Sequence, residues 1–169
     1  MLVYYTSNIE KLSPNVYQFR EYRDFGRGFY VTSNQEQAEA NGRHYLQRGE
    51  TTYLYVFELD DIPPLFTYKR FQTLDGEWLD YVIACWKGQP QESYDIIEGG
   101  IVDHQVFDIV DLYLKKEISR EEAISQLSSK TPNFHICINN QLIISRLLHP
   151  VKSVKLSKHH NLKHKFSAL

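Results

Sequence analysis

Residues 24–40, DFGRGFYVTSNQEQAEA, place two glycines and an arginine directly before an apolar strand and a helix. A turn needs one glycine and a strand needs none. Gly26 and Gly28 therefore either permit a tight turn with close strand packing or form the floor of a site. Ser33, with Glu36 three residues on, matches a capping box and predicts a helix over 34–47. We expect this helix to pack behind the strand 28–32.

The rest of the chain mixes strand and helix signals without regular alternation. Strands are predicted over 2–8, 28–32, 52–59, 94–102, 133–139 and 151–156, and helices over 34–47, 76–88, 107–116, 119–127 and 141–148. Because these elements do not repeat as βαβ units, the predicted fold class is α+β. The chain has no P-loop, CxxC pair, HExxH or GxSxG motif, so no common catalytic or binding motif indicates a function.

The length of 169 residues favours one domain, which we place at 1–157, followed by a basic tail at 158–169. No acidic residue follows Glu122, so the C-terminal part is strongly basic. This asymmetry predicts either a solvated tail or an anionic partner. His159, His160 and His164 lie in the tail without cysteine or acidic partners, so no metal site is expected.

Other sequence features bear on localisation. No apolar run approaches the roughly 20 residues needed to cross a bilayer, and no signal peptide is evident. We therefore expect a cytoplasmic protein with no membrane partner. Cys85 and Cys137 stand in apolar contexts without metal-ligand spacing, which is typical of buried, reduced thiols.

The motifs, taken in order, resemble the ADP-ribosyltransferase superfamily. VYYTSN followed by GRGFYVTSNQEQAEANG is locally similar to poly(ADP-ribose) polymerases. The chain looks closer to a bacterial family of unknown function placed among the ADP-ribosyltransferase relatives. That family has a DFGxGFYxT segment, a QA helix, an EWL helix, a strand beginning YD and ending in glycine, and a late strand with a central cysteine. The resemblance runs from Val3 to about Leu148.

The resemblance implies two small antiparallel sheets that form an NAD-binding cleft with flanking helices. By position, Tyr5 and Thr6 correspond to residues that hold the nicotinamide amide, although the family usually has histidine and glycine there. Arg27 and Gly28 belong to the implied cofactor-binding segment. Tyr30 corresponds to a tyrosine on which relatives stack the nicotinamide ring.

The resemblance also implies a catalytic acid on a late strand. Cleavage of the bond between ribose and nicotinamide develops positive charge on the sugar, so a carboxylate is needed to stabilise it. His135 occupies the corresponding slot, where the closer family tends to have glutamine. Glu98 and Asp103 are the acids that could replace the missing glutamate, and they join Tyr30 and His135 as catalytic candidates.

Each candidate also has a structural interpretation. Tyr5 and Tyr30 fit packed strand or core residues, and His135 fits a structural residue. Glu98 fits an acid that points to solvent. Asp103 fits the N-cap of a helix over 104–116.

The function implied by the resemblance is an enzyme that uses NAD as a substrate and transfers ADP-ribose to a macromolecular acceptor, either protein or nucleic acid. Short free-standing bacterial members suggest a toxin of a toxin–antitoxin pair or a phage-defence effector, with a neutralising antitoxin protein as partner. The alternative is a catalytically degenerate relative that binds nucleotide, nucleic acid or protein. A nucleic-acid binder that uses the basic C-terminal part and exposed tyrosines is a third interpretation.

Overall fold

The computed structural model describes residues 1–157, so the basic tail with its three histidines lies outside the described residues. The chain divides into two compact units. Among the described residues, the first contains residues 1–14, 31–61 and 144–157, and the second contains residues 15–30 and 62–143.

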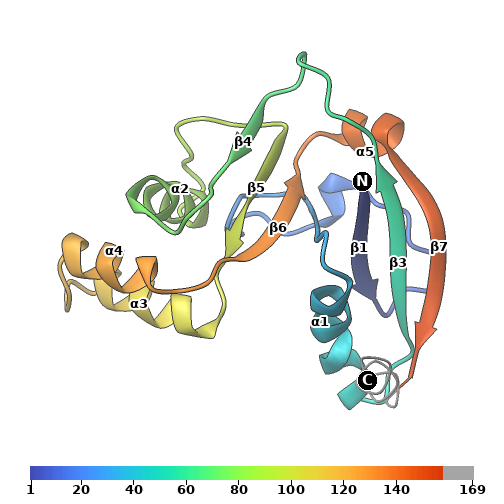
Figure 1. Ribbon diagram of the computed structural model, residues 1–169, viewed down its shortest axis with the longest axis horizontal. Helices are drawn as coiled ribbons and strands as arrows, with labels where there is room; N and C mark the ends of the chain where they lie inside the picture. The colour runs from blue at the N-terminus through green and yellow to red at the C-terminus, as the bar shows by residue number, and fades with distance from the viewer. Residues whose placement is uncertain (158–169) are drawn as a thin grey trace, which may run out of the picture. The chain divides into compact units, whose positions relative to one another are not determined.

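The first unit is built on a three-stranded antiparallel sheet in the order β1-β3-β7 (Figure 1). These strands are β1 (Leu2–Ser7), β3 (Thr52–Leu59) and β7 (Leu148–Leu156). The central strand β3 is almost wholly buried, which accounts for the β-branched and aromatic residues of its sequence, TYLYVFEL.

Helix α1 (Gln35–Gln47) packs against β1 and β3 of this sheet. Gly42 allows the close approach, because a Cβ there would lie 2.4 Å from Thr6 Cγ2. The Thr6 hydroxyl also donates a hydrogen bond to the Ala38 carbonyl. The helix therefore covers β1 and β3, whereas the sequence predicted that it packs behind the strand 28–32.

The N-cap of α1 is Asn34, whose side chain accepts a hydrogen bond from the Gln37 N–H at 3.1 Å. The sequence predicted Ser33 with Glu36 as a capping box, and that prediction was wrong by one residue. Asparagine and serine cap helices about equally well, so two adjacent candidates could not be separated by residue type.

The second unit is built on a four-stranded sheet in the order β2-β6-β5-β4. Its strands are β2 (Phe29–Val31), β6 (Asn133–Ile138), β5 (Ile96–Ile101) and β4 (Tyr68–Arg70). β5 and β6 are antiparallel, whereas β4 and β5 are parallel. The expectation of two purely antiparallel sheets is therefore corrected, because β4 makes this sheet mixed.

Three helices supply most of the core of the second unit: α2 (Gly76–Trp86), α3 (His104–Leu114) and α4 (Arg120–Ser128). Trp78 is fully buried in α2, and its indole N–H donates to the Gly100 carbonyl at 2.8 Å. A capping box of Ser119 and Glu122 begins α4. A short 3-10 turn, Val16–Gln18, and helix α5 (Gln141–Leu147) complete the elements named here.

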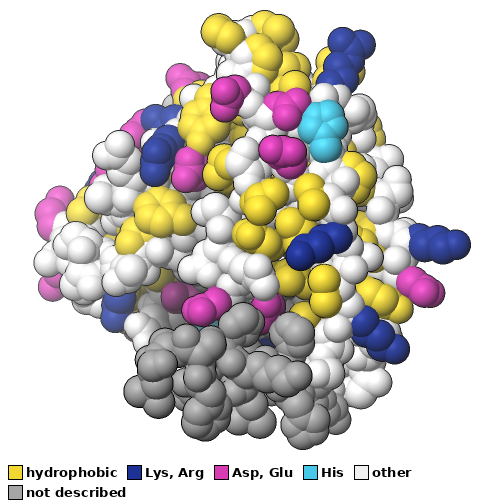
Figure 2. Space-filling model, turned by 45° about the vertical axis from the view of Figure 1, so that its right-hand side comes forward, with side chains coloured by type: hydrophobic (Ala, Val, Ile, Leu, Met, Phe, Trp, Pro, Cys, Tyr) yellow, Lys and Arg dark blue, Asp and Glu magenta, His cyan; other side chains and the backbone are white. Residues whose placement is uncertain are grey.

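The α+β class predicted from the sequence is confirmed by these two sheets and their helices. Among the described residues, no helix is long and apolar enough to cross a membrane. On the face drawn in Figure 2, described Lys and Arg side chains stand apart, with hydrophobic and acidic side chains between them. That face, in its described part, therefore lacks a continuous basic patch of the kind that nucleic-acid binders present.

Candidate functional site

The segment 24–30, which we call the signature loop, is closed by its own backbone and by one tyrosine. Gly26 has φ +79°, the left-handed region that favours glycine. The Tyr30 hydroxyl donates to the Gly26 carbonyl at 2.7 Å and accepts from the Phe25 N–H at 3.0 Å. Tyr30 therefore holds in place the loop that leads into its own strand.

Gly28 serves a different purpose from Gly26, because it permits close contact with strand β6. A Cβ at this position would lie 2.5 Å from Cys137 Sγ and 2.9 Å from the Ile138 carbonyl oxygen. Both neighbours would have to move to admit any side chain at this position. Gly26 therefore has the turn role, and Gly28 the close-packing role, of the structural interpretation of the sequence. Together they set the position of Arg27, which lies between them.

The ring of Tyr30 is enclosed by its neighbours. The Arg23 guanidinium carbon lies 3.7 Å from the Tyr30 ring centroid, a cation–π contact, and the Phe25 ring is nearly parallel at 6.4 Å. Tyr30 is only 5% exposed, and burial raises the pKa of its hydroxyl. A nicotinamide ring would reach the ring face covered by Arg23 only by displacing that guanidinium.

Arg27 is held between the two glycines and forms an ion pair with Glu21. Its Nε is buried and has no hydrogen-bond partner among the described residues. A buried donor without an acceptor costs about 1–3 kcal/mol, so such groups call for an explanation. Arg27 is the one predicted cofactor-binding residue that combines a positive charge with an unmade hydrogen bond.

Asp24 begins the signature loop and ties it to two other segments of the second unit. Its carboxylate accepts hydrogen bonds from the Trp86 indole N–H at 2.9 Å and from the Val102 N–H at 2.8 Å. Burial raises the pKa of Asp24, and the two hydrogen bonds oppose that shift. The sequence analysis assigned no role to Asp24, and its place in the DFGRGFY motif was the only signal.

Glu98 lies in β5 beside two residues of β4. Its carboxylate accepts a hydrogen bond from the Tyr68 hydroxyl, and its Oε2 is 3.6 Å from Arg70 Nε. Its side chain is 20% exposed. Glu98 is therefore an accessible carboxylate that is oriented by a phenol and an arginine, rather than an acid pointing freely into solvent.

His135 lies on the opposite face of the same sheet from Glu98. In the β5–β6 register, Glu98 pairs with Ile136 and Gly99 pairs with His135. Because side chains alternate along a strand, the His135 and Glu98 side chains point away from each other. His135 instead shares its face with Cys137, which belongs to the same buried cluster as Tyr30.

His135 is 5% exposed, and burial lowers its pKa to about 4, with the nearby positive charge of Arg23 adding to the shift. The imidazole is therefore neutral at pH 7. A neutral ring adds no positive charge beside a developing sugar cation.

Lowering the pH from 7 to 5 is expected to destabilise the protein through His135. In the unfolded chain this histidine takes up a proton near pH 6.5, whereas the folded protein resists protonation down to about pH 4. The unfolded chain binds more protons within this window, so the free energy of unfolding falls as the pH falls. The contribution of His135 over this pH change is about 2 kcal/mol.

Urea unfolding at the two pH values, on the wild type and His135→Gln, measures this contribution. The wild type should lose about 2 kcal/mol more than the variant on going to pH 5. Equal losses would show that His135 is not the group responsible.

Asp103 is the N-cap of α3, and its Oδ1 accepts a hydrogen bond from the Val106 N–H at 2.9 Å. This is the structural interpretation that the sequence left open. The helix accordingly begins at His104, three residues before the predicted start at Phe107. A catalytic role for Asp103 stays a prediction, and its carboxylate already has a structural task.

Tyr5 and Thr6 belong to the first unit, whereas Arg27, Gly28 and Tyr30 belong to the second. Tyr5 pairs with Tyr55 in the β1–β3 ladder and is half-buried. Thr6 is buried against α1. A pocket shared by Tyr5, Thr6, Gly28 and Tyr30 stays a prediction.

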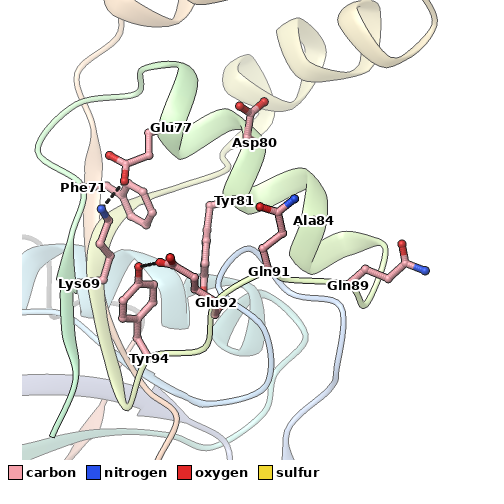
Figure 3. Close-up of a pocket in the computed structure, with 10 residues that line it drawn as sticks. All are labelled: Lys69, Phe71, Glu77, Asp80, Tyr81, Ala84, Gln89, Gln91, Glu92 and Tyr94. Atoms are coloured by element: carbon pink, nitrogen blue, oxygen red, sulfur yellow. Dashed lines mark hydrogen bonds and ion pairs between the residues drawn. The ribbon is translucent and has the colours of Figure 1, made fainter.

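A cavity that the sequence analysis did not anticipate lies within the second unit (Figure 3). It has a volume of about 340 Å³ and is lined by Lys69 of β4, by Phe71 directly after that strand, and by residues of α2 and of the segment 89–94. Its lining includes three aromatic residues, three acidic residues and one lysine. No sequence pattern connects these positions, because only tertiary packing brings them together. Its carboxylates would repel the two phosphates of NAD, so we do not assign it to that cofactor.

Within residues 1–157, no group of three His, Cys, Asp or Glu side chains is arranged to hold a metal ion. Cys85 and Cys137 are both buried, as predicted. Burial raises the pKa of the Cys85 thiol to about 11 and raises that of Cys137 as well, so neither is a reactive thiolate at neutral pH.

Comparison with known proteins gave one match. The profile of a family described as "protein of unknown function (DUF3990)" matches residues 1–149, so the chain belongs to this family. No curated protein and no solved structure matches it significantly. The match agrees with the resemblance to an uncharacterised family.

Proposed function

We propose that this member of the DUF3990 family is an NAD-binding protein of the ADP-ribosyltransferase type, with the signature loop as part of its NAD site. Three things support the proposal: the order of motifs along the chain, the loop fixed by Tyr30, and the charge that this loop presents. The single observation that carries it is Arg27, whose buried Nε has no acceptor among the described residues.

In this proposal the diphosphate of NAD takes the place of Glu21 at the Arg27 guanidinium. The Glu21 side chain is about half exposed, so its ion pair with Arg27 contributes little and is easily exchanged. A diphosphate offers a guanidinium several oxygens in a geometry that suits bidentate hydrogen bonds. Gly28 leaves no side chain between the arginine and strand β6.

Arg27→Ala is expected to weaken NAD binding by about 10–100-fold, because a charge-assisted hydrogen bond is worth about 1.5–3 kcal/mol. Arg20→Ala is the matched control, since Arg20 is an exposed arginine of the same segment with no assigned contact to NAD. Titration calorimetry of the full chain with NAD measures both. If both substitutions weakened NAD binding equally, the loss would reflect only the protein's overall charge and not a specific contact of Arg27.

The catalytic part of the proposal places Glu98 as the acid that stabilises the sugar cation, which requires the ribose of NAD to lie on the sheet face opposite His135 and Cys137. Glu98 is accessible and oriented by Tyr68 and Arg70, whereas the Asp103 carboxylate caps a helix. In the reaction, the bond between ribose C1 and the nicotinamide nitrogen breaks, and its electron pair leaves with nicotinamide. The acceptor nucleophile then bonds to C1 and loses its proton.

A second candidate function is binding of NAD without turnover. The opposite orientations of Glu98 and His135 favour it, because one ligand on one face of the sheet cannot contact both side chains. So does Tyr30, whose hydroxyl and ring are both engaged inside the protein. Release of nicotinamide by the purified protein, with cell lysate as a source of acceptor, separates the two functions: release supports the enzyme, and binding without release supports the module.

A further inference from the structure

The pocket between β4, α2 and the segment 89–94 has the chemistry of a cation site. Its aromatic rings form a row: Phe71 and Tyr81 lie 5.4 Å apart, and Tyr81 and Tyr94 lie 5.9 Å apart, with the planes of each pair tilted by 44° and 48°. The faces of aromatic rings carry negative potential and attract cations. Figure 3 shows Lys69 and Phe71 from the strand side, Tyr81 from the helix and Tyr94 from the loop.

The protein already places one of its own cations in this pocket. Lys69 Nζ lies 5.0 Å from the Phe71 ring centroid and forms an ion pair with Glu77. An ammonium group on an aromatic face with a carboxylate beside it is therefore stable here. The ring that Lys69 contacts is Phe71.

The charge at the Tyr94 end is not balanced in the same way. Asp80, on the helix side, is neutralised by Arg120, whose guanidinium contacts both carboxylate oxygens at 2.5 and 2.8 Å. Glu92 accepts a hydrogen bond from the Tyr94 hydroxyl, but it takes part in no ion pair within residues 1–157. Glu92 thus supplies a negative charge without a cation, next to an aromatic ring.

We propose that this pocket binds the guanidinium group of an arginine side chain from a partner polypeptide, stacked on Tyr94 and paired with Glu92. A guanidinium can stack its flat face on an aromatic ring while its N–H groups, which lie in its own plane, hydrogen-bond a carboxylate. An ammonium does this less well. The side-chain amides of Gln89 and Gln91 line the same cavity and offer further acceptor oxygens. The site is separate from the residues proposed to contact NAD, and it stands whether or not that proposal holds.

The test uses the full chain labelled with ¹⁵N and three small probes: the N-acetyl methylamides of arginine, citrulline and lysine. Citrulline has nearly the shape of arginine without its charge, so it separates charge from shape. The arginine probe should give saturable amide shifts confined to residues 69–71, 77–84 and 89–94, and the citrulline probe should bind at least 10-fold more weakly. The lysine probe should bind more weakly than the arginine probe.

Two substitutions locate the site. Glu92→Gln should weaken arginine binding about 5- to 10-fold, and Tyr94→Leu, which keeps an apolar side chain but removes the ring, about 3- to 5-fold. Glu117→Gln is the matched control, because it removes one exposed acid of the same unit outside the pocket, and it should leave binding unchanged. The dispersion of the amide spectrum shows that each variant is folded.

Four results would overturn the proposal. One is binding of citrulline as tight as that of arginine, which would make charge irrelevant. Another is lysine binding equal to arginine, which would remove the guanidinium assignment. The last two are the absence of saturable shifts in the pocket, and shifts that Glu92→Gln leaves unchanged.

Discussion

Replacing Glu98 with glutamine is expected to slow nicotinamide release from NAD by about 10²–10³-fold, the usual effect of losing one preorganised electrostatic contact. Glutamine keeps the shape of the side chain and an acceptor for the Tyr68 hydroxyl, but it loses the negative charge. NAD affinity should change far less, because the lost contact acts mainly on the transition state. Rates of nicotinamide release and binding constants, measured side by side on purified protein, give both quantities.

Asp103→Asn is the matched control for this substitution. It also removes one carboxylate charge, but asparagine caps helices as well as aspartate does, so α3 should be retained. Turnover should stay close to that of the wild type. If Glu98→Gln and Asp103→Asn both retained full activity, no replacement acid would operate at either position and the mechanism would fail.

Asp24→Ala is expected to lower the free energy of unfolding by about 3 kcal/mol. The substitution leaves two part-buried donors, the Trp86 indole N–H and the Val102 N–H, without an acceptor, and a buried donor without an acceptor costs about 1–3 kcal/mol. Urea unfolding followed by tryptophan fluorescence measures the change, since Trp86 itself reports the local environment.

Two further variants test the cause of this loss. Asp24→Asn keeps one acceptor oxygen, so it should cost less than Asp24→Ala. Glu21→Ala removes a half-exposed acid of the same segment and should change stability by no more than about 0.5 kcal/mol. A loss for Asp24→Ala as small as that for Glu21→Ala would show that the two hydrogen bonds contribute little.

Local signals in the sequence located most helices and strands. The apolar periodicity of 76–88 corresponds to α2, whose buried residues include Trp78 and Val82. Strand β4 was missed because it has only three residues, and its burial pattern shows no apolar alternation. Its parallel pairing with β5 depends on tertiary contacts that no local pattern encodes.

The candidate site was less predictable than the fold. The sequence indicated that Gly26 and Gly28 were special, and the structure gives each a separate reason in a positive φ and a close strand contact. The N-cap interpretation of Asp103 could be stated in advance because capping is local. The face of the sheet that Glu98 occupies could not, since it depends on the register between β5 and β6.

The role of Asp24 and the aromatic pocket could not be predicted from the sequence, because both depend on contacts between distant parts of the chain. Asp24 binds partners 62 and 78 residues away along the chain. The pocket joins Lys69, Tyr81 and Tyr94 from a strand, a helix and a loop. A single sequence gives no distance information between such positions.

The central claim is that the signature loop forms part of an NAD site, and titration calorimetry of the wild type and Arg27→Ala with NAD tests it most directly. The account predicts saturable binding of one NAD per chain to the wild type and binding about 10–100-fold weaker to Arg27→Ala. Absence of saturable binding to the folded wild type, or equal binding to the two proteins, would contradict it.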